Sequence, residues 1–147
     1  MSHSSGLRRS EVIKARFLLK QESLSDQIGR ESEERFEALL LHLHKNRMLP
    51  WLRGFARATA TQDWLKKTDF TLRVVTDTKI DGNNTGQIEF LIPIQVKSSW
   101  AGLEKFRKEN PNSPVRPVAV FRTMGPGRLQ RILYEIYRKE ARARVQT

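Results

Sequence analysis

The chain has 147 residues, enough for one globular domain with a hydrophobic core but too few for two domains of ordinary size. Its 27 lysine and arginine residues outnumber 16 aspartate and glutamate residues, and the net charge of +11 favours a polyanionic partner, above all nucleic acid, because phosphate contacts release condensed counterions. The absence of cysteine excludes disulfide bonds and thiolate metal sites, and no apolar run is long enough to span a bilayer.

The first nine residues are polar and basic, and we expect them to be disordered. They contain no apolar stretch of the kind that forms a signal peptide, so we expect an intracellular, cytoplasmic protein without a membrane partner. Residues 10–147 are expected to form a single domain with its core at about residues 26–122.

Two helices are predicted before the first strand. A short helix covers about residues 10–22, and a longer helix covers about residues 26–46. The longer helix has an apolar stripe of Phe36, Leu39, Leu40 and Leu43. Glu33 extends this stripe by one turn toward the N-terminus. We therefore predict that Glu33 is the acidic residue of this helix that faces the core.

Three strands are predicted in the middle of the chain, over residues 51–60, 68–80 and 88–97. Residues 81–86 are rich in glycine, asparagine and aspartate, so the last two strands should form an antiparallel hairpin. The strand over residues 88–97 alternates apolar residues with others, which is typical of a strand with one buried face. Pro93 predicts a bulge in this strand, or a strand end that is open on one side.

The hairpin also predicts which polar side chains lie close together. Gln95 and Lys97 are two residues apart in a strand, so their side chains emerge on the same side of the sheet. With the turn centred between Asn83 and Asn84, Asp69 falls opposite about residue 98. This register predicts that Asp69 lies beside Lys97.

The last third of the chain predicts a helix, a strand and a second helix. The first helix covers residues 100–109 and buries Trp100, Leu103 and Phe106. The strand at residues 115–122 should run parallel to the strand before the helix. The final amphipathic helix covers about residues 127–143. Its basic side predicts nucleic-acid contacts by Arg128, Arg131, Arg138, Lys139 and Arg142, and solvated surface residues are the alternative.

Three short motifs occur in this framework: Gly29-Arg-Glu-Ser-Glu33, Lys67-Thr-Asp69-Phe and Ile94-Gln-Val-Lys97-Ser-Ser. Their order and context resemble the PD-(D/E)XK nuclease superfamily over about residues 28–122, nearest to its Holliday-junction-resolvase-like and restriction-endonuclease-like members. The resemblance implies a restriction-endonuclease-like α/β fold, with an α-β-β-β-α-β core, a mixed four-stranded sheet flanked by helices, and additional N- and C-terminal helices. Thr68 replaces a frequent proline. Gln95 replaces the usual glutamate or aspartate, as in the Gln-x-Lys branch.

The resemblance implies a metal-dependent endonuclease that hydrolyses DNA phosphodiester bonds. Mg²⁺ or Mn²⁺ would be held by Asp69, the Gln95 side-chain oxygen, the Val96 carbonyl and Glu33, which would ligate directly or through water. Lys97 would orient or deprotonate the attacking water. Oxygen ligands suit Mg²⁺, which can both activate water and stabilise charge on phosphoryl oxygens. A homodimer would suit cleavage of both strands, and no small-molecule cofactor is expected.

Two further interpretations stay open. The first is a DNA-binding module on the nuclease fold whose active site has decayed, because Gln95 lacks the charge of a carboxylate. The second is a basic RNA-binding protein, which would not require the residues of the three motifs to lie together.

Overall fold

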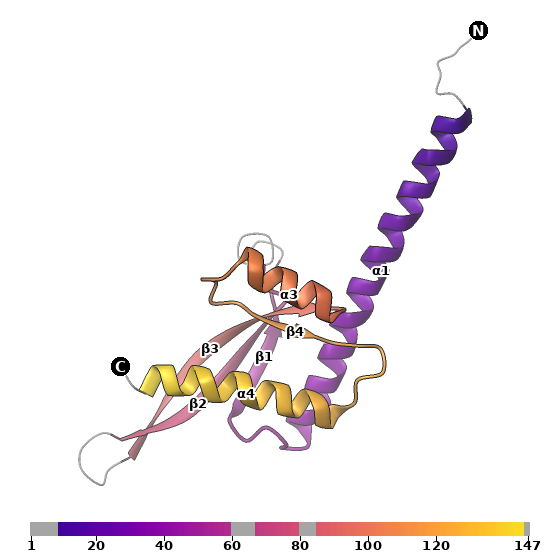
Figure 1. Cartoon of the computed structure of the whole chain (residues 1–147). Coiled ribbons are helices and arrows are strands. Elements are labelled where there is room, and N and C mark those ends of the chain that lie inside the picture. The colour runs from indigo at the N-terminus through magenta and orange to yellow at the C-terminus, as the bar shows by residue number, and fades with distance from the viewer. Residues whose placement is uncertain (1–8, 60–66, 80–84, 146–147) are drawn as a thin grey trace.

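The computed structural model describes the backbone of residues 9–59, 67–79 and 85–145 and the side chains of residues 24–59, 67–78 and 86–145. Its elements, in chain order, are α1 (Arg9–Lys45), β1 (Leu52–Arg57), β2 (Phe70–Lys79), β3 (Thr85–Lys97), α3 (Trp100–Glu109), β4 (Arg116–Ala119) and α4 (Pro126–Val145) (Figure 1). The segments predicted as a disordered N-terminus (residues 1–8) and as the centre of the hairpin turn (residues 80–84) lie outside the described residues.

The four strands form one sheet in the order β1-β2-β3-β4. β2 runs antiparallel to both β1 and β3, whereas β4 runs parallel to β3. The predicted α/β class and mixed four-stranded sheet flanked by helices are therefore confirmed. The β4 ladder begins at Ile94, so Pro93 lies where β3 has no neighbour on its β4 side, and the β2 ladder passes Pro93 without a bulge.

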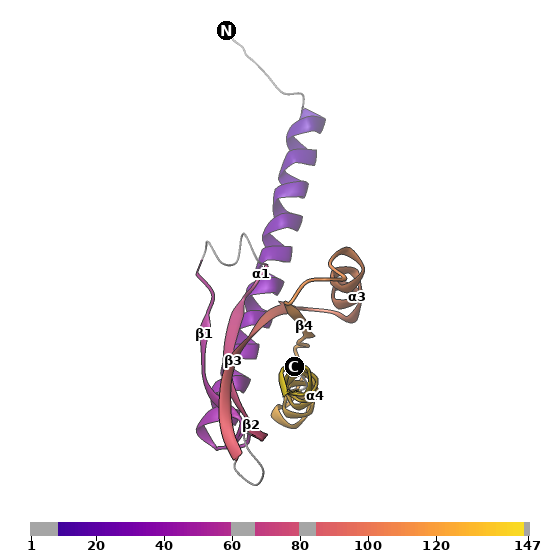
Figure 2. The ribbon, with the colours of Figure 1, turned by 90° about the vertical axis from the view of Figure 1, so that its left-hand side faces the viewer.

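The alternation of apolar residues along β3 decides which helices cover each face of the sheet. Phe90, Ile92, Ile94 and Val96 are buried in one core with residues of β2, α1 and α4. Phe36 of α1 packs against Phe70 of β2, with ring centroids 4.8 Å apart. Lys97, which points to the other face, contacts α3. β4 thus lies between α3 and α4, as Figures 1 and 2 both show.

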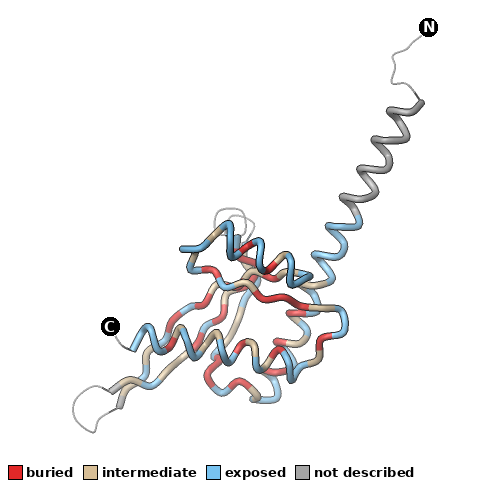
Figure 3. The backbone as a smooth tube through the Cα atoms, in the orientation of Figure 1, coloured by how far each residue is buried: buried red, intermediate tan, exposed pale blue. Residues whose placement is uncertain are grey.

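The two predicted N-terminal helices are one continuous helix, so the predicted break near residues 23–25 is wrong. The segment contains no proline, and serine alone does not end a helix. Residues 24–31 are exposed, and the helix joins the core only from about Phe36 onward. Figure 1 shows the first half of α1 extending away from the sheet, and Figure 3 shows exposed residues along α1 before it reaches the core. Within the described residues, no helix combines the length and apolar character needed to cross a bilayer.

The hairpin of β2 and β3 forms as predicted, but its register is shifted by three residues. Phe70 pairs with Ile94 and Lys79 pairs with Thr85. Continuing the ladder by one residue places Asp69 opposite Gln95 instead of residue 98. The predicted register is therefore wrong, and Lys97 lies two residues further along β3 than the position that faces Asp69. The error arose because the predicted turn centre lay one and a half residues too late in the chain.

An aromatic pair fixes α4 against the far end of the sheet. Trp51, which precedes β1 and is only 7% exposed, stacks on Tyr137 of α4 with ring centroids 4.4 Å apart. The Tyr137 hydroxyl donates a hydrogen bond to the Val75 carbonyl of β2 at 2.9 Å. The Val75 N–H donates to the Trp51 carbonyl at 2.9 Å, so Tyr137 joins α4 to both chain segments at the same end of the β1–β2 pair, by stacking and by hydrogen bonding.

We expect Tyr137→Phe to lower the free energy of unfolding by about 0.5–1.5 kcal/mol, because it removes this hydrogen bond and retains the stacked ring. Urea denaturation of the purified protein measures the change. Tyr134→Phe is the matched control, because Tyr134 lies on the same helix and is exposed. Equal stability of the two variants would contradict a role for the hydroxyl group.

Candidate active site

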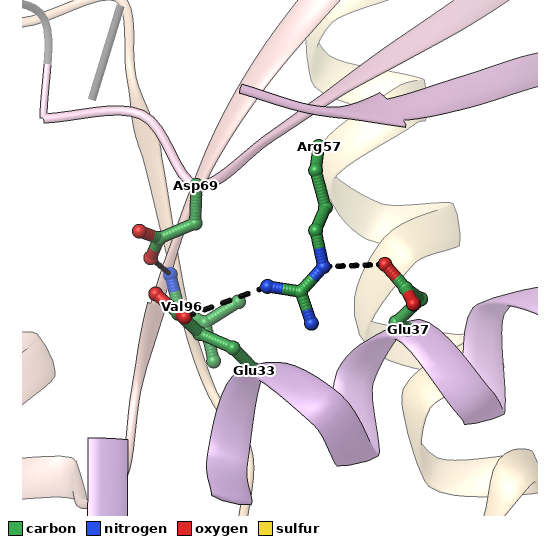
Figure 4. Close-up of polar contacts among 5 residues, drawn as sticks. All are labelled: Glu33, Glu37, Arg57, Asp69 and Val96. Atoms are coloured by element: carbon green, nitrogen blue, oxygen red, sulfur yellow. Dashed lines mark hydrogen bonds and ion pairs between the residues drawn. The ribbon is translucent and has the colours of Figure 1, made fainter. Parts of the chain in front are cut away.

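Asp69 is held at three points where β2 begins. Its N–H donates to the Ile94 carbonyl and its carbonyl accepts from the Ala58 N–H, both at 2.8 Å. Its Oδ2 accepts a hydrogen bond from the Val96 N–H at 2.7 Å (Figure 4). The β2–β3 ladder ends where Phe70 pairs with Ile94, so the Val96 N–H has no main-chain acceptor on β2 and donates to the Asp69 carboxylate instead. Asp69 is therefore both buried and fixed in orientation.

Gln95 lies next to Asp69 when the ladder is continued by one residue. The Gln95 Oε1 atom is buried, and it accepts no hydrogen bond from the described part of the protein. A buried carbonyl oxygen without a donor costs about 1–3 kcal/mol, and such an atom in a native structure calls for a ligand or water. The side-chain oxygen of Gln95 is thus positioned to bind a group that the described residues do not supply.

Lys97 lies on the same face of β3 as Gln95 and packs under the start of α3. Its Nζ lies 5.4 Å from the centre of the Phe106 ring. Its side-chain stem is 3.7 Å from the point that a Cβ on Gly102 would occupy, so the first turn of α3 approaches it closely. No acidic side chain of the described residues forms an ion pair with Lys97. Its positive charge is therefore available to an anionic ligand.

Glu33 reaches the same end of the sheet through Arg57. Arg57 pairs with Phe70 in the β1–β2 register, and its guanidinium lies 5.1 Å from the Phe70 ring centre. The guanidinium contacts Glu37 through Nε at 2.6 Å and Glu33 through Nη1 at 3.7 Å. Figure 4 shows Glu33, Arg57 and Asp69 at this end of the sheet. Because Phe70 follows Asp69 directly, the ion pair brings Glu33 to the part of β2 that carries Asp69.

The structure thus brings some of the predicted site residues into direct proximity and places the others nearby with different partners. Asp69, Gln95 and Val96 lie together at the end of the β2–β3 ladder. Lys97 is adjacent, with its ammonium group turned toward Phe106. Glu33 is paired with Arg57. Among the described residues, no three histidine, cysteine, aspartate or glutamate side chains are arranged to share a metal ion, and the predicted ligand set contains only two carboxylates.

The five basic residues predicted to contact nucleic acid are all exposed on α4. At 100° per residue they span an arc of about 100° on one side of the helix. Glu135 lies within this arc and pairs with Arg138 at 3.1 Å. The side of α4 opposite its buried residues Leu129 and Leu133 is therefore strongly basic, although not uniformly so.

Trp100 differs from its prediction as a core residue, because it is 49% exposed. On a helix, Trp100 lies about 60° from Leu103 and about 120° from Phe106, so it is at the margin of the stripe that these two buried residues define. Trp100 is thus an exposed aromatic residue three residues after Lys97 in the sequence.

The sequence analysis did not identify Arg57 as a residue of the site, although its position in the strand indicates that it faces α1. Phe55 and Arg57 are two residues apart in a strand, so Arg57 falls on the face that contacts α1. A basic residue on that face can form an ion pair with an acidic side chain of the helix that covers it. The two glutamates one turn apart on the preceding helix, Glu33 and Glu37, were the available candidates.

Comparison of the chain with protein-family models, with curated proteins and with solved structures finds no match. The site is therefore interpreted from its own geometry. That geometry provides the fixed carboxylate of Asp69 at the start of β2, facing Gln95 and Lys97 on β3. Within the part of the chain that the structure describes, the Gln95 side-chain oxygen has no hydrogen-bond partner and Lys97 has no acidic partner.

We expect Asp69→Ala to destabilise the fold by about 1–3 kcal/mol, because it leaves the buried Val96 N–H without an acceptor. Asp69→Asn keeps a side-chain oxygen at this position and should cost less. Thermal or urea unfolding of the two variants measures the difference. Asp77→Asn, at the exposed end of β2, is the control. If Asp69→Ala were as stable as Asp77→Asn, the hydrogen bond would have no structural role.

Proposed function

We propose that the protein is a metal-dependent nuclease of the restriction-endonuclease-like type that hydrolyses DNA phosphodiester bonds. The observation that supports this most directly is the buried Gln95 Oε1, which has no hydrogen-bond donor among residues 24–59, 67–78 and 86–145 and lies next to the fixed carboxylate of Asp69. A buried oxygen of this kind is stabilised by a cation, and Mg²⁺ prefers oxygen ligands from one or two carboxylates together with water and substrate.

The residues present fit such an ion. Asp69 would be the main ligand, with Gln95 Oε1 and the Val96 carbonyl beside it, and Glu33 would complete the set directly or through water. When bound, Mg²⁺ or Mn²⁺ supplies a more acidic water and stabilises negative charge on the phosphoryl oxygens. The three main-chain and side-chain hydrogen bonds of Asp69 preorganise its carboxylate, so little reorganisation is needed on binding.

Lys97 would act on the substrate from the α3 side of β3. It has no acidic partner within the described residues, so its ammonium group can offset the charge that develops on the phosphate and orient the attacking water. Arg57 would hold Glu33 at the site when no metal is bound. Because the Glu33–Arg57 separation is 3.7 Å and both side chains are partly exposed, this ion pair is weak enough to be exchanged for another ligand of Glu33.

The basic surface supports a nucleic-acid substrate. The net charge of +11 and the five exposed basic residues of α4 provide the non-specific electrostatic attraction that phosphates require. Phosphate contacts of this kind position a duplex without reading its sequence.

A DNA-binding module with a decayed active site is the second candidate. Gln95 favours it, because an amide binds a divalent cation more weakly than a carboxylate would. A basic RNA-binding protein does not account for the buried oxygen of Gln95 beside Asp69, so we place it third.

We expect Lys97→Ala and Asp69→Asn to abolish metal-dependent cleavage while sparing most of the DNA affinity, since these residues serve the reaction and the basic surface supplies binding. Cleavage of labelled branched, linear and single-stranded DNAs over a Mg²⁺ and Mn²⁺ titration measures activity. Lys105→Ala is the matched control, because Lys105 is an exposed lysine of α3 outside the site. Retained cleavage by Lys97→Ala would exclude the role assigned to Lys97.

Gln95→Glu distinguishes the enzyme from the decayed module. Added carboxylate charge should tighten the divalent ion, so an active wild type should remain active in this variant and need less metal. Cleavage by Gln95→Glu with an inert wild type would identify a decayed nuclease whose other residues remain competent. If both proteins bind DNA but neither cleaves at high metal, the nuclease proposal fails and the binding module stands.

DNA affinity should fall steeply with salt, and Arg131→Ala and Arg138→Ala should each reduce the slope of log affinity against log salt by about 1. Fluorescence anisotropy at several salt concentrations measures the slope. The loss should be similar for different DNA sequences, because phosphate contacts are not sequence-specific. Arg53→Ala, an exposed arginine of β1, serves as the comparison variant. Salt-independent binding would argue against DNA as the partner.

A further inference from the structure

A groove lies between α3 and α4 above the edge of β4, with a volume of about 930 Å³. We call it the α3–α4 groove; its apolar lining includes Trp100, Phe106, Val118, Ile132, Ile136 and Ala143. β4 has a strand neighbour only on its β3 side within the described sheet, so the groove follows an open sheet edge. Binding sites for small molecules occupy about 300–1,000 Å³, so this volume can take more than one flat aromatic base.

The charges along the groove are predominantly positive. Its two acidic side chains are already paired, Glu135 with Arg138 and Glu140 with Arg116. In contrast, Arg131 and Lys139 also line the groove and form no ion pair with an acid of the described chain. An occupant that combines apolar flat surfaces with negative charge would match both the walls and the rim.

The Trp100 end of the groove adjoins the proposed active site. Trp100 is half exposed, and the guanidinium of Arg128 lies 5.8 Å from its ring centre. Phe121 supports the indole from the side, with ring centroids 5.4 Å apart. The same first turn of α3 that carries Trp100 packs against Lys97 through Gly102. An aromatic platform and a cation are therefore held a few residues from the candidate catalytic lysine.

We propose that the α3–α4 groove binds an unpaired stretch of DNA, with one base stacked on Trp100 and the adjoining phosphates near Arg128 and Arg131. Single strands expose both the bases that stack on aromatic side chains and the phosphates that bind a basic groove. A duplex keeps its bases stacked inside and needs no apolar groove. The preferred substrates of the proposed nuclease are then DNAs with a single-stranded tail or flap, and this last step alone rests on the proposed function.

The test compares a duplex carrying a single-stranded tail with a blunt duplex of equal total charge, in the presence of a metal chelator. Wild type should bind the tailed duplex more tightly. Trp100→Ala should weaken that binding by about 5- to 150-fold, the usual effect of losing one stacking residue, and leave blunt-duplex binding nearly unchanged. Trp100→Phe should retain most of the affinity, and this second variant guards against a loss caused by misfolding.

Two matched controls come from the same chain. Tyr134 is 48% exposed on α4, outside the α3–α4 groove, so Tyr134→Ala should bind both DNAs like wild type. Arg107 and Arg73 are similarly exposed and each pairs with one glutamate, but only Arg107 lines the groove. Arg107→Ala should therefore weaken binding of the tailed duplex selectively, and Arg73→Ala should not.

Equal affinity for tailed and blunt duplexes, or equal effects of Trp100→Ala and Tyr134→Ala, would overturn the proposal. Displacement of the tailed DNA by a poly-glutamate peptide of equal charge, at equal concentration, would also overturn it in favour of an acidic protein partner. A clear preference for an RNA tail would overturn the assignment to DNA. Because the binding test contains a chelator, it is independent of cleavage. Failure of the separate cleavage assay would refute the proposed nuclease and leave the groove proposal standing, whereas equal binding of tailed and blunt duplexes would refute the groove proposal alone.

Discussion

The alternation of side chains along β3 is the constraint on which the other elements depend. This strand of 13 residues lies between β2 and β4, and only every second side chain can enter the core shared with α1 and α4. Ile94 and Val96 take those positions, so Gln95 and Lys97 must emerge on the α3 face. The alternation that buries Ile94 and Val96 in the core therefore also places the two proposed site residues of β3, Gln95 and Lys97, on one face.

At the end of the β2–β3 ladder, the Asp69 carboxylate has both a structural role and a position suited to the proposed chemistry. A strand that loses its neighbour leaves an N–H to be satisfied, and the Asp69 carboxylate meets that need at Val96. A carboxylate placed for this reason is also buried, oriented and next to the unpaired oxygen of Gln95. Arg57 has a comparable dual position, since it links β1 to α1 and contacts two glutamates.

Local patterns predicted what depends on local structure. The bounds of α3 follow from the Ser99 cap and the apolar spacing of Leu103 and Phe106, and the observed helix has the predicted limits. The hairpin register depends on turn geometry that composition does not specify, and a three-residue shift moved Asp69 from Lys97 to Gln95. The contact of Glu33 with Arg57 joins residues far apart in the sequence, and no local pattern encodes it.

The closeness of Gly102 to its neighbours also restricts how sequences with this fold can diverge. A Cβ there would lie 3.3 Å from Ser99 Oγ, the atom that accepts a hydrogen bond from the Gly102 N–H, and 3.7 Å from the Lys97 stem. The first contact is tight, so a larger residue at this position requires Ser99 Oγ to move by a few tenths of an ångström, whereas the contact with Lys97 is of ordinary length. Substitution at 102 should therefore act on the helix cap first, and positions 99 and 102 should tend to vary together during evolution.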